Sequence, residues 1–288
     1  MALMDEFKEE REMIKNASFQ KRLEYFWEYY KWWVIGGVFV IIVASMTIHS
    51  IATRKKEVLY VAMINAVEVA GSDVNSNIKE PFLLNHELDP KKNNINLDSD
   101  VKMNFTSIAH TKANPVPEGY EEHVSTYNSA NARQTLSVYI AAAQVDMIVS
   151  TENWFDEYAY GSFYLPLSEV LTAEEMEKYS DYFYYIDDAV RKRYKKATDE
   201  RDYNFTEMYP DPYDLESMEE PVAYGLIAGD NSLLIACYGF IPEYKEDNIV
   251  IGVMANGTNP ELTHDLLIQL IDDVAGQTSN AESNSASE

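Results

Sequence analysis

The segment of residues 94–100, NINLDSD, comes closest in this sequence to a metal-binding pattern. Its oxygen-bearing side chains alternate along the chain, as they do in part of the calcium loop of an EF-hand. An EF-hand loop also has glycine at its sixth position and glutamate at its twelfth, and both are missing here. We therefore predict no metal site.

Catalytic motifs are missing from the sequence as well. It has no GxSxG nucleophile elbow, no HExxH zinc motif, no phosphate-binding P-loop and no dinucleotide-binding GxGxxG. Its five histidines are scattered, and its single cysteine, Cys237, excludes an intrachain disulfide and a cysteine-based zinc or iron–sulfur site. We predict a protein that is not an enzyme and has no cofactor.

Aromatic residues gather between Trp154 and Tyr185. Flat aromatic faces can line a site for a sugar or a peptide, because such ligands have apolar faces of their own. The same residues can instead pack the core of a small second lobe. We favour the core, and the ligand platform stays open as the alternative.

Acidic residues dominate the chain after residue 56. The whole chain has 23 Lys and Arg and 48 Asp and Glu, of which residues 1–56 hold nine and seven. Residues 57–288 therefore have 23 − 9 = 14 basic and 48 − 7 = 41 acidic residues, a net charge of −27. Such a domain is repelled by nucleic acid and by anionic lipid surfaces, so we predict no nucleic-acid partner.

Residues 32–52 carry no charged side chain, and we predict that they form a transmembrane helix. A helix of these 21 residues spans about 30 Å, the thickness of the hydrocarbon core of a bilayer. Aromatic residues crowd its amino-terminal side, as at a membrane–water interface, and Arg54, Lys55 and Lys56 close the other end. The apolar region is longer than that of a cleaved signal peptide, which favours an uncleaved signal anchor.

Residues 1–31 are expected to form a cytoplasmic juxtamembrane helix with a ragged apolar stripe. We favour an ordinary juxtamembrane stalk, and a helix that lies on the membrane surface or docks a membrane-protein partner stays open as the alternative. Within 20 residues of the span, four basic residues lie on its amino-terminal side and three on its carboxyl-terminal side. The positive-inside rule thus barely distinguishes the two orientations. We place the N-terminus in the cytoplasm and the C-terminal domain outside the cell, the usual orientation of a signal anchor.

Short apolar runs alternate with helical stretches in the first half of the domain after residue 56. Such alternation is typical of a mostly parallel sheet with helices on both faces. We predict strands at 58–67, 101–109 and 146–150 and helices at 78–88 and 129–144.

The second half of this domain has clearer helix signals. Thr172 and Glu175 form a capping-box pattern, and Leu and Ile residues after Pro260 fall on one helical face. The polar segment 191–221, with several prolines, is expected to be a long ordered loop, and the tail 276–288 to be disordered. We predict further helices at 153–160, 172–182 and 260–274 and further strands at 222–228, 232–238 and 248–254.

Residues 129–171 follow a recognisable order. An Ala-rich helix leads to a short strand that opens with Asp146, and the next predicted helix carries Phe155 and Tyr158. Gly161 follows, and then the run LPLSEVL, which has the form Leu-x-x-Leu.

This order resembles the extracytoplasmic solute-binding proteins of bacterial importers that have the type II periplasmic-binding fold. Residues 251–271 are similar to the final strand, loop and helix of that family, with Asn259 and Pro260 opening the helix. The resemblance implies an α/β fold in which the transmembrane helix precedes a type II periplasmic-binding-like, two-lobed domain over 57–275. About 220 residues is short for that family, so the second lobe must be small.

The resemblance also implies where a ligand binds. In open α/β sheets the ligand lies at the carboxyl ends of the strands, here between the two lobes. Helix N-termini at that edge offer free N–H groups to anionic or hydroxyl-bearing ligands. From this topology we predict ligand contacts at Asn65, Asn128, Ser129, Thr151, Asn153 and Tyr224.

Two functions are favoured over an enzyme at this point. The first is a non-catalytic, membrane-anchored domain outside the cell that binds a small solute, a sugar or a peptide. The second is a structural or interaction subunit of a membrane complex, which uses a degenerate solute-binding fold and contacts its partner through residues 1–31. A ligand-sized cleft favours the first, and a filled cleft favours the second.

Overall fold

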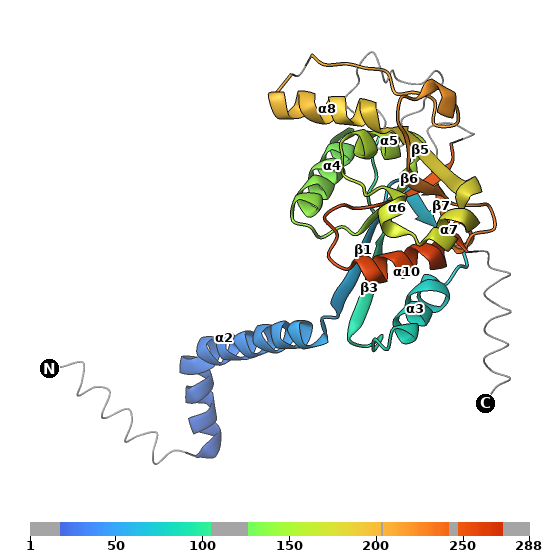
Figure 1. Ribbon diagram of the computed structural model, residues 1–288. Helices are drawn as coiled ribbons and strands as arrows, with labels where there is room; N and C mark the ends of the chain where they lie inside the picture. Colours follow the sequence, from blue (N-terminus) through green and yellow to red (C-terminus); the bar gives the residue numbers. More distant parts are fainter. Residues whose placement is uncertain (1–17, 105–125, 203, 242–246, 273–288) are drawn as a thin grey trace, which may run out of the picture. The chain divides into compact units, whose positions relative to one another are not determined.

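The computed structural model describes residues 18–104, 126–202, 204–241 and 247–272. The chain divides into two compact units, Met1–Arg54 and Lys55–Glu288. The first contains a single long helix in its described part, and the second is an α/β domain (Figure 1). The predicted tail 276–288 lies outside the described residues, as do the first 17 residues of the predicted cytoplasmic helix.

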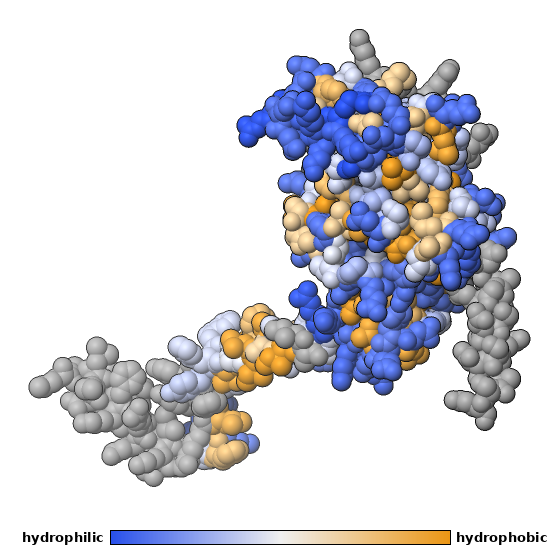
Figure 2. All heavy atoms as spheres, in the orientation of Figure 1, coloured by the Kyte–Doolittle hydropathy of each residue, from blue (hydrophilic) through white to orange (hydrophobic). Residues whose placement is uncertain are grey.

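Helix α2, Phe19–Thr53, is 35 residues long and exposes apolar side chains along much of its length (Figure 2). The stretch Tyr30–Ser50 is long and apolar enough to cross a membrane, and none of it is buried by the rest of the protein. One of its polar side chains bonds within the helix: the hydroxyl of Thr47 donates to the carbonyl of Val43 (2.8 Å), four residues earlier. The predicted span 32–52 lies inside α2.

The α/β domain is built on a mixed six-stranded sheet in the order β3-β1-β4-β8-β6-β5. The strands β1 (Lys56–Met63), β3 (Asn93–Asp98) and β4 (Met147–Thr151) are parallel. The remaining neighbours pair antiparallel through β8 (Ile249–Val253), β6 (Pro221–Ile227) and β5 (Phe183–Asp187). A two-stranded ribbon joins β2 (Ala66–Glu68) to β7 (Tyr238–Phe240). The sheet is therefore mixed rather than mostly parallel.

Helices cover both faces of this sheet, as predicted. Alternate residues of β1 enter two separate cores, with Val61 and Met63 on one face and Tyr60 and Ala62 on the other. The first face is covered by η1 (Asn75–Lys79), α3 (Glu80–Asn85), α6 (Leu167–Val170), α7 (Ala173–Lys178), α9 (Leu233–Cys237) and α10 (Pro260–Ile271). The second is covered by α4 (Thr126–Ala141), α5 (Glu152–Tyr160) and α8 (Asp188–Glu200).

The second strand of the sheet was predicted in the wrong place. Residues 101–104 form no strand, and residues 105–109 lie outside the described residues. The strand is instead β3, whose Ile95 and Leu97 are buried while its Asn and Asp side chains are not. Asn and Asp disfavour strands, but pairing with β1 and the burial of two apolar side chains override that preference.

The predicted strand 232–238 is also wrong, because most of it is the short helix α9. The buried hydroxyl of Ser232 accepts a hydrogen bond from the amide of Ile235 (3.4 Å), which makes Ser232 the helix cap. Only Tyr238 from the predicted run begins a strand, β7.

The segment 191–221 is not one long loop, because its first ten residues belong to α8. Val190 and Ala197 are buried and Tyr194 packs beside them, so one face of this highly charged helix meets the core. The lysines Lys192, Lys195 and Lys196 are exposed on the other side, where the surface over α8 is hydrophilic (Figure 2). The loop proper therefore begins at Arg201, which caps the helix in a left-handed conformation.

Several other elements are confirmed. The strand predicted at 146–150 is β4, the helix at 153–160 is α5, and the helix at 260–274 is α10 as far as Ile271. The capping box at Thr172 and Glu175 is formed in both directions. The final predicted strand, 248–254, is β8.

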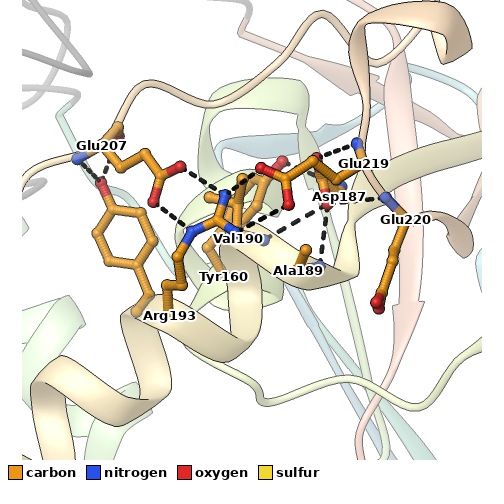
Figure 3. A network of polar contacts seen from close by, with 9 residues as sticks. Tyr160, Asp187, Ala189, Val190, Arg193, Glu207, Glu219 and Glu220 are labelled. Atoms are coloured by element: carbon orange, nitrogen blue, oxygen red, sulfur yellow. Dashed lines mark hydrogen bonds and ion pairs between the residues drawn. The ribbon is translucent and has the colours of Figure 1, made fainter.

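The buried carboxylate of Asp187 holds the end of the long loop against the start of α8 (Figure 3). Its oxygens accept from the amides of Ala189 (2.9 Å) and Val190 (3.4 Å) in the first turn of the helix, and from those of Glu219 (2.7 Å) and Glu220 (3.2 Å) in the loop. A carboxylate at a helix N-terminus is also stabilised by the helix dipole.

A second clamp holds the same loop to α8. The guanidinium of Arg193 lies between two carboxylates, 2.6 Å from an oxygen of Glu207 and 3.0 Å from one of Glu219 (Figure 3). Next to it, the hydroxyl of Tyr194 accepts from the amide of Glu207 (3.0 Å) and donates to its carbonyl (2.5 Å). The long loop is therefore ordered by contacts that polar composition alone does not reveal.

Replacing Asp187 tests how much its carboxylate contributes to stability. Asp187→Asn removes the charge and turns one acceptor into a donor that faces backbone N–H groups. We expect a loss of about 2–4 kcal/mol in the free energy of unfolding, because buried donors are left without acceptors. Urea unfolding of the full-length protein, followed by circular dichroism, measures this loss. The exposed residue Asp181 provides the control, and Asp181→Asn is expected to change stability by less than about 0.5 kcal/mol. Equal effects of the two substitutions would contradict this account.

Candidate ligand-binding site

A cavity of about 480 Å³ lies at the edge of the sheet where β4 begins and β8 ends. Its walls come from the residue before β4, the end of β8 with the loop that follows it, helix α6 and the first turns of α10. The side chains that matter for its chemistry are Asp146, Glu169, Glu261 and His264, with apolar walls that include Val253 and Met254.

Asp146 is the most buried charged residue of the cavity wall, with 2% of its surface exposed. Its Oδ2 accepts from the amide of Tyr60 in β1 (2.9 Å), and its Oδ1 accepts from the amide of Thr258 in the loop after β8 (3.0 Å). Its own carbonyl accepts from the amide of Met254 (2.9 Å). One residue therefore joins the strand β1 to the loop that forms the cavity wall.

Gly257 allows this loop to pass close to the carboxylate. A Cβ atom at this position would lie 3.3 Å from Oδ1 of Asp146, which is tighter than an ordinary contact. Asn259 continues the same loop, and its side-chain amide donates to the carbonyl of Val58 (2.8 Å). The loop between β8 and α10 is thus attached to β1 at two points.

His264 connects the cavity wall to two neighbouring elements. Its Nε2 lies 3.0 Å from Oε2 of Glu175 at the start of α7, and its Nδ1 lies 2.7 Å from Oδ1 of Asp265. The other oxygen of Asp265 lies 2.9 Å from Nε2 of His86, next to α3. When His264 is protonated, both of its N–H groups therefore have carboxylate acceptors.

These contacts shift the pKa values of His264 and Glu175 in opposite directions. Burial disfavours the charged form of His264, but the carboxylates of Glu175 and Asp265 outweigh it and raise the pKa of the imidazole. Burial likewise opposes ionisation of Glu175, but hydrogen bonds from His264 and Thr172 outweigh it and lower the pKa of that carboxyl to about 2.

The structure places Asn65 and Ser129, two of the predicted contacts, against the same short segment. The side chain of Asn65 accepts from the amide of Met103 (2.8 Å) and donates to its carbonyl (2.8 Å), and Asn65 itself adopts a left-handed conformation with φ 59°. The hydroxyl of Ser129 accepts from the amide of Asn104 (2.7 Å). Both side chains are buried and bind the backbone of residues 101–104.

The other predicted contacts are dispersed. Thr151 is buried at the end of β4, while Asn128 on α4 is exposed and Asn153 on α5 is partly exposed. The buried hydroxyl of Tyr224 donates to Asp188 (2.8 Å) at the start of α8. None of the six predicted residues lines the cavity described above.

The sequence did not predict this cavity, because the predicted ligand contacts were placed at the carboxyl ends of the parallel strands, which is the opposite edge of the sheet. The parallel strands β1 and β4 end at one edge, whereas the cavity lies where β4 starts. The antiparallel strand β8 brings its carboxyl end and the following loop to that same place. The signal in the sequence was Asp146 at the start of an apolar strand, together with the run ANGTNP after the last strand.

Two carboxyl groups with raised pKa values lie outside the cavity, next to each other on α5. Burial raises the pKa of Asp156 to about 8, against a hydrogen bond from Tyr184 (3.0 Å) that lowers it. Burial also raises the pKa of Glu157 to about 7, against the charge of Arg133. Since neither group lines the cavity, they provide it with no acid–base pair.

Comparison with known proteins provides no relative from which to transfer a function. No protein-family model matches the chain, and neither a curated protein nor a solved structure matches it significantly. Among the described residues, no group of three or more His, Cys, Asp or Glu side chains is arranged to hold a metal ion. The function must therefore be inferred from the cavity and the elements around it.

The ion pair between His264 and Glu175 predicts a pH-dependent stability. A raised histidine pKa stabilises the fold fully below its ordinary value of 6.5, and this contribution is lost as the pH rises through the folded-state pKa. A lowered glutamate pKa stabilises the fold above its ordinary value of 4.5 and is lost as the pH falls toward about 2. The pair therefore contributes most between about pH 4.5 and 6.5.

Glu175→Gln isolates this charge, because glutamine can still complete the capping box. We expect the Tm of this variant to fall below that of the wild type most at about pH 5.5, and the difference to shrink as the pH rises through the raised pKa of His264. Glu174→Gln is the matched control at the exposed neighbouring position and should show no such dependence. A difference between Glu175→Gln and the wild type that stays constant from pH 5.5 to 9 would show that the ion pair does not act this way.

Proposed function

We propose that this protein is a single-pass membrane protein whose α/β domain binds a small solute outside the cell, without catalysis. Helix α2 is the membrane anchor, with the N-terminus in the cytoplasm and the domain after residue 56 outside. The observation that carries the proposal is the cavity at the start of β4. Its volume of about 480 Å³ lies within the range of about 300–1,000 Å³ that is usual for small-molecule sites.

The composition of the cavity wall supports binding. Ligand sites combine a mostly apolar lining with a few fixed polar groups that orient the ligand. Here Leu165, Val170 and Val253 supply apolar wall, and Asp146 is held in place by amide hydrogen bonds from two different elements. A site whose polar groups are already positioned loses little entropy on binding.

The relation to solute-binding proteins is part of the proposal. It is supported by the order of α4, β4, α5 and α6, which follows the pattern of residues 129–171 seen in the sequence. The described part of the domain contains one six-stranded sheet and a two-stranded ribbon, without a separate second lobe among those residues. A two-lobed periplasmic-binding fold over 57–275 therefore stays a prediction.

The anchor is supported by the length and exposure of α2. Its apolar stretch of 21 residues, Tyr30–Ser50, is left uncovered by the rest of the protein, and a bilayer would cover it. The net charge of −27 on residues 57–288 would keep that domain away from anionic lipid headgroups. A domain that is tethered but repelled in this way leaves its cavity accessible to solutes.

A second candidate, an interaction subunit of a membrane complex, is favoured by a different observation. The first half of α2 exposes Phe19, Leu23, Trp27 and Tyr30 at spacings of three and four residues, which places them along one side of the helix. Such a stripe suits a partner helix. The two candidates differ in the part of the chain they need: blocking the cavity abolishes the first function and leaves the second intact.

A bulky side chain in the cavity tests the proposed function. Ala255 is exposed and lines the cavity, so Ala255→Phe fills part of it without disturbing a buried position. The full-length protein in lipid nanodiscs is screened by thermal shift against sugars, amino acids, short peptides, amines and carboxylates. A true ligand at 100 times its Kd stabilises the fold by about 2.7 kcal/mol, a rise of at least about 5 °C in Tm.

We expect this rise in the wild type and its loss in Ala255→Phe. Ala236→Phe, at an exposed alanine on α9 away from the cavity, is the control and should retain it. If no compound in the panel stabilises the wild type, or if the rise persists in Ala255→Phe, the cavity is not the binding site and the proposal fails.

A further inference from the structure

The charges around the cavity are almost all of one sign. Asp146, Glu169 and Glu261 line it, and among the described lining residues there is no Lys or Arg. Among the same lining residues the one basic side chain is His264, and two carboxylates, those of Glu175 and Asp265, already lie against it. A ligand that enters this space therefore meets unbalanced negative charge.

Asp146 is the most buried of these carboxylates. It is 2% exposed, and it takes part in none of the ion pairs formed by the described residues. Three amide and hydroxyl contacts, from Tyr60 and Thr258, orient its oxygens and leave acceptor capacity unused. A cationic ligand in the cavity would add a charge-assisted hydrogen bond to this oriented carboxylate.

The apolar side chains of the wall indicate which chemical group carries the positive charge of the ligand. Leu165, Val170, Val253 and Met254 present aliphatic side chains to the cavity, and the surface over α6 and α10 mixes hydrophobic with hydrophilic residues (Figure 2). Aliphatic walls favour a hydrocarbon chain and disfavour a hydrated metal ion, which requires a shell of oxygen ligands. The net charge of −27 on residues 57–288 also attracts cations over a longer range.

We propose that the cavity binds a small organic cation, a primary ammonium group on an apolar chain. The ammonium donates hydrogen bonds to Asp146 and lies in the field of Glu169 and Glu261, and the chain packs on the aliphatic wall. An ammonium suits this site because its three donors can meet carboxylate oxygens from different elements. This inference rests on the proposed solute-binding function and gives the class of the solute.

Three compounds of one shape and different charge test the inference. Butylammonium, 1-butanol and butyrate are titrated against the full-length protein in nanodiscs by ligand-observed NMR at fixed ionic strength, with empty nanodiscs as the blank. We expect butylammonium to bind at least tenfold more tightly than either of the other two compounds. Tighter or equal binding of butanol or butyrate would overturn the inference.

Single Glu→Gln substitutions inside and outside the cavity show whether binding of butylammonium depends on the cavity. Glu169→Gln and Glu261→Gln change exposed side chains, so both variants should fold, and each is expected to weaken butylammonium about threefold to tenfold. Glu216→Gln makes the same change in charge at an exposed position outside the cavity, in the short 3-10 helix Leu215–Ser217, and should weaken butylammonium binding less than twofold. Equal effects at all three positions would mean that only the overall charge attracts the cation, and would overturn the inference.

One further compound shows whether the ammonium group belongs to a free amine or to a lysine side chain of a peptide. A capped Gly-Lys-Gly tripeptide carries the same butylammonium group on a peptide backbone. Weaker binding of the peptide than of butylammonium indicates a free amine, and tighter binding indicates a lysine side chain; both keep the ammonium class.

Failure of the inference is separable from failure of the proposed function. If butylammonium does not bind but another compound of the panel stabilises the wild type and not Ala255→Phe, the cavity is a solute site and only the cation class is wrong. If no compound at all gives a rise that Ala255→Phe removes, both the inference and the proposed function fail.

Discussion

The carboxylate of Asp146 is the contact on which the architecture around the cavity depends. It accepts from Tyr60 in β1 and from Thr258 in the loop after β8, and its backbone carbonyl accepts from Met254. These bonds connect three segments that are far apart in the sequence at the point where β4 begins. Helix α10 starts directly after that loop, so its first turns, with Glu261 and His264, are positioned by the same contacts. A residue that orders the sheet edge thereby also supplies the buried charge of the cavity.

Polar contacts of this kind recur through the domain and explain its ordered loops. Asp187 holds the loop before β6 to α8 through four amides, and Asn65 holds residues 101–104 to the end of β1. In each case a short polar side chain satisfies backbone groups that no strand or helix satisfies. The cavity differs from these sites in that its carboxylates outnumber the groups available to neutralise them. That imbalance is the reason to expect a cationic solute there rather than a purely structural role.

Part of this fold could be predicted from the sequence, because local signals agree with the final structure. The apolar run at 146–150, the capping box at Thr172 and the amphipathic pattern after Pro260 each needed only neighbouring residues. Strand β3 and helix α8 were missed because distant contacts decide them: β3 forms against β1 despite its Asn residues, and one narrow face of α8 packs on the core. The site was missed for a related reason, since the sequence does not reveal that β8 runs antiparallel to β4 and brings its following loop to the opposite edge.

The most direct test of the account is the chemical accessibility of the cavity on intact cells. Cys237 is the single cysteine and is buried, so Ala255→Cys introduces one thiol at the cavity rim. A membrane-impermeant maleimide is added before and after lysis, with Ala236→Cys as an exposed control on the same domain. We predict that both new cysteines are labelled on intact cells and that the wild-type protein is not labelled. Labelling only after lysis would place the domain in the cytoplasm and contradict capture of solutes from outside the cell.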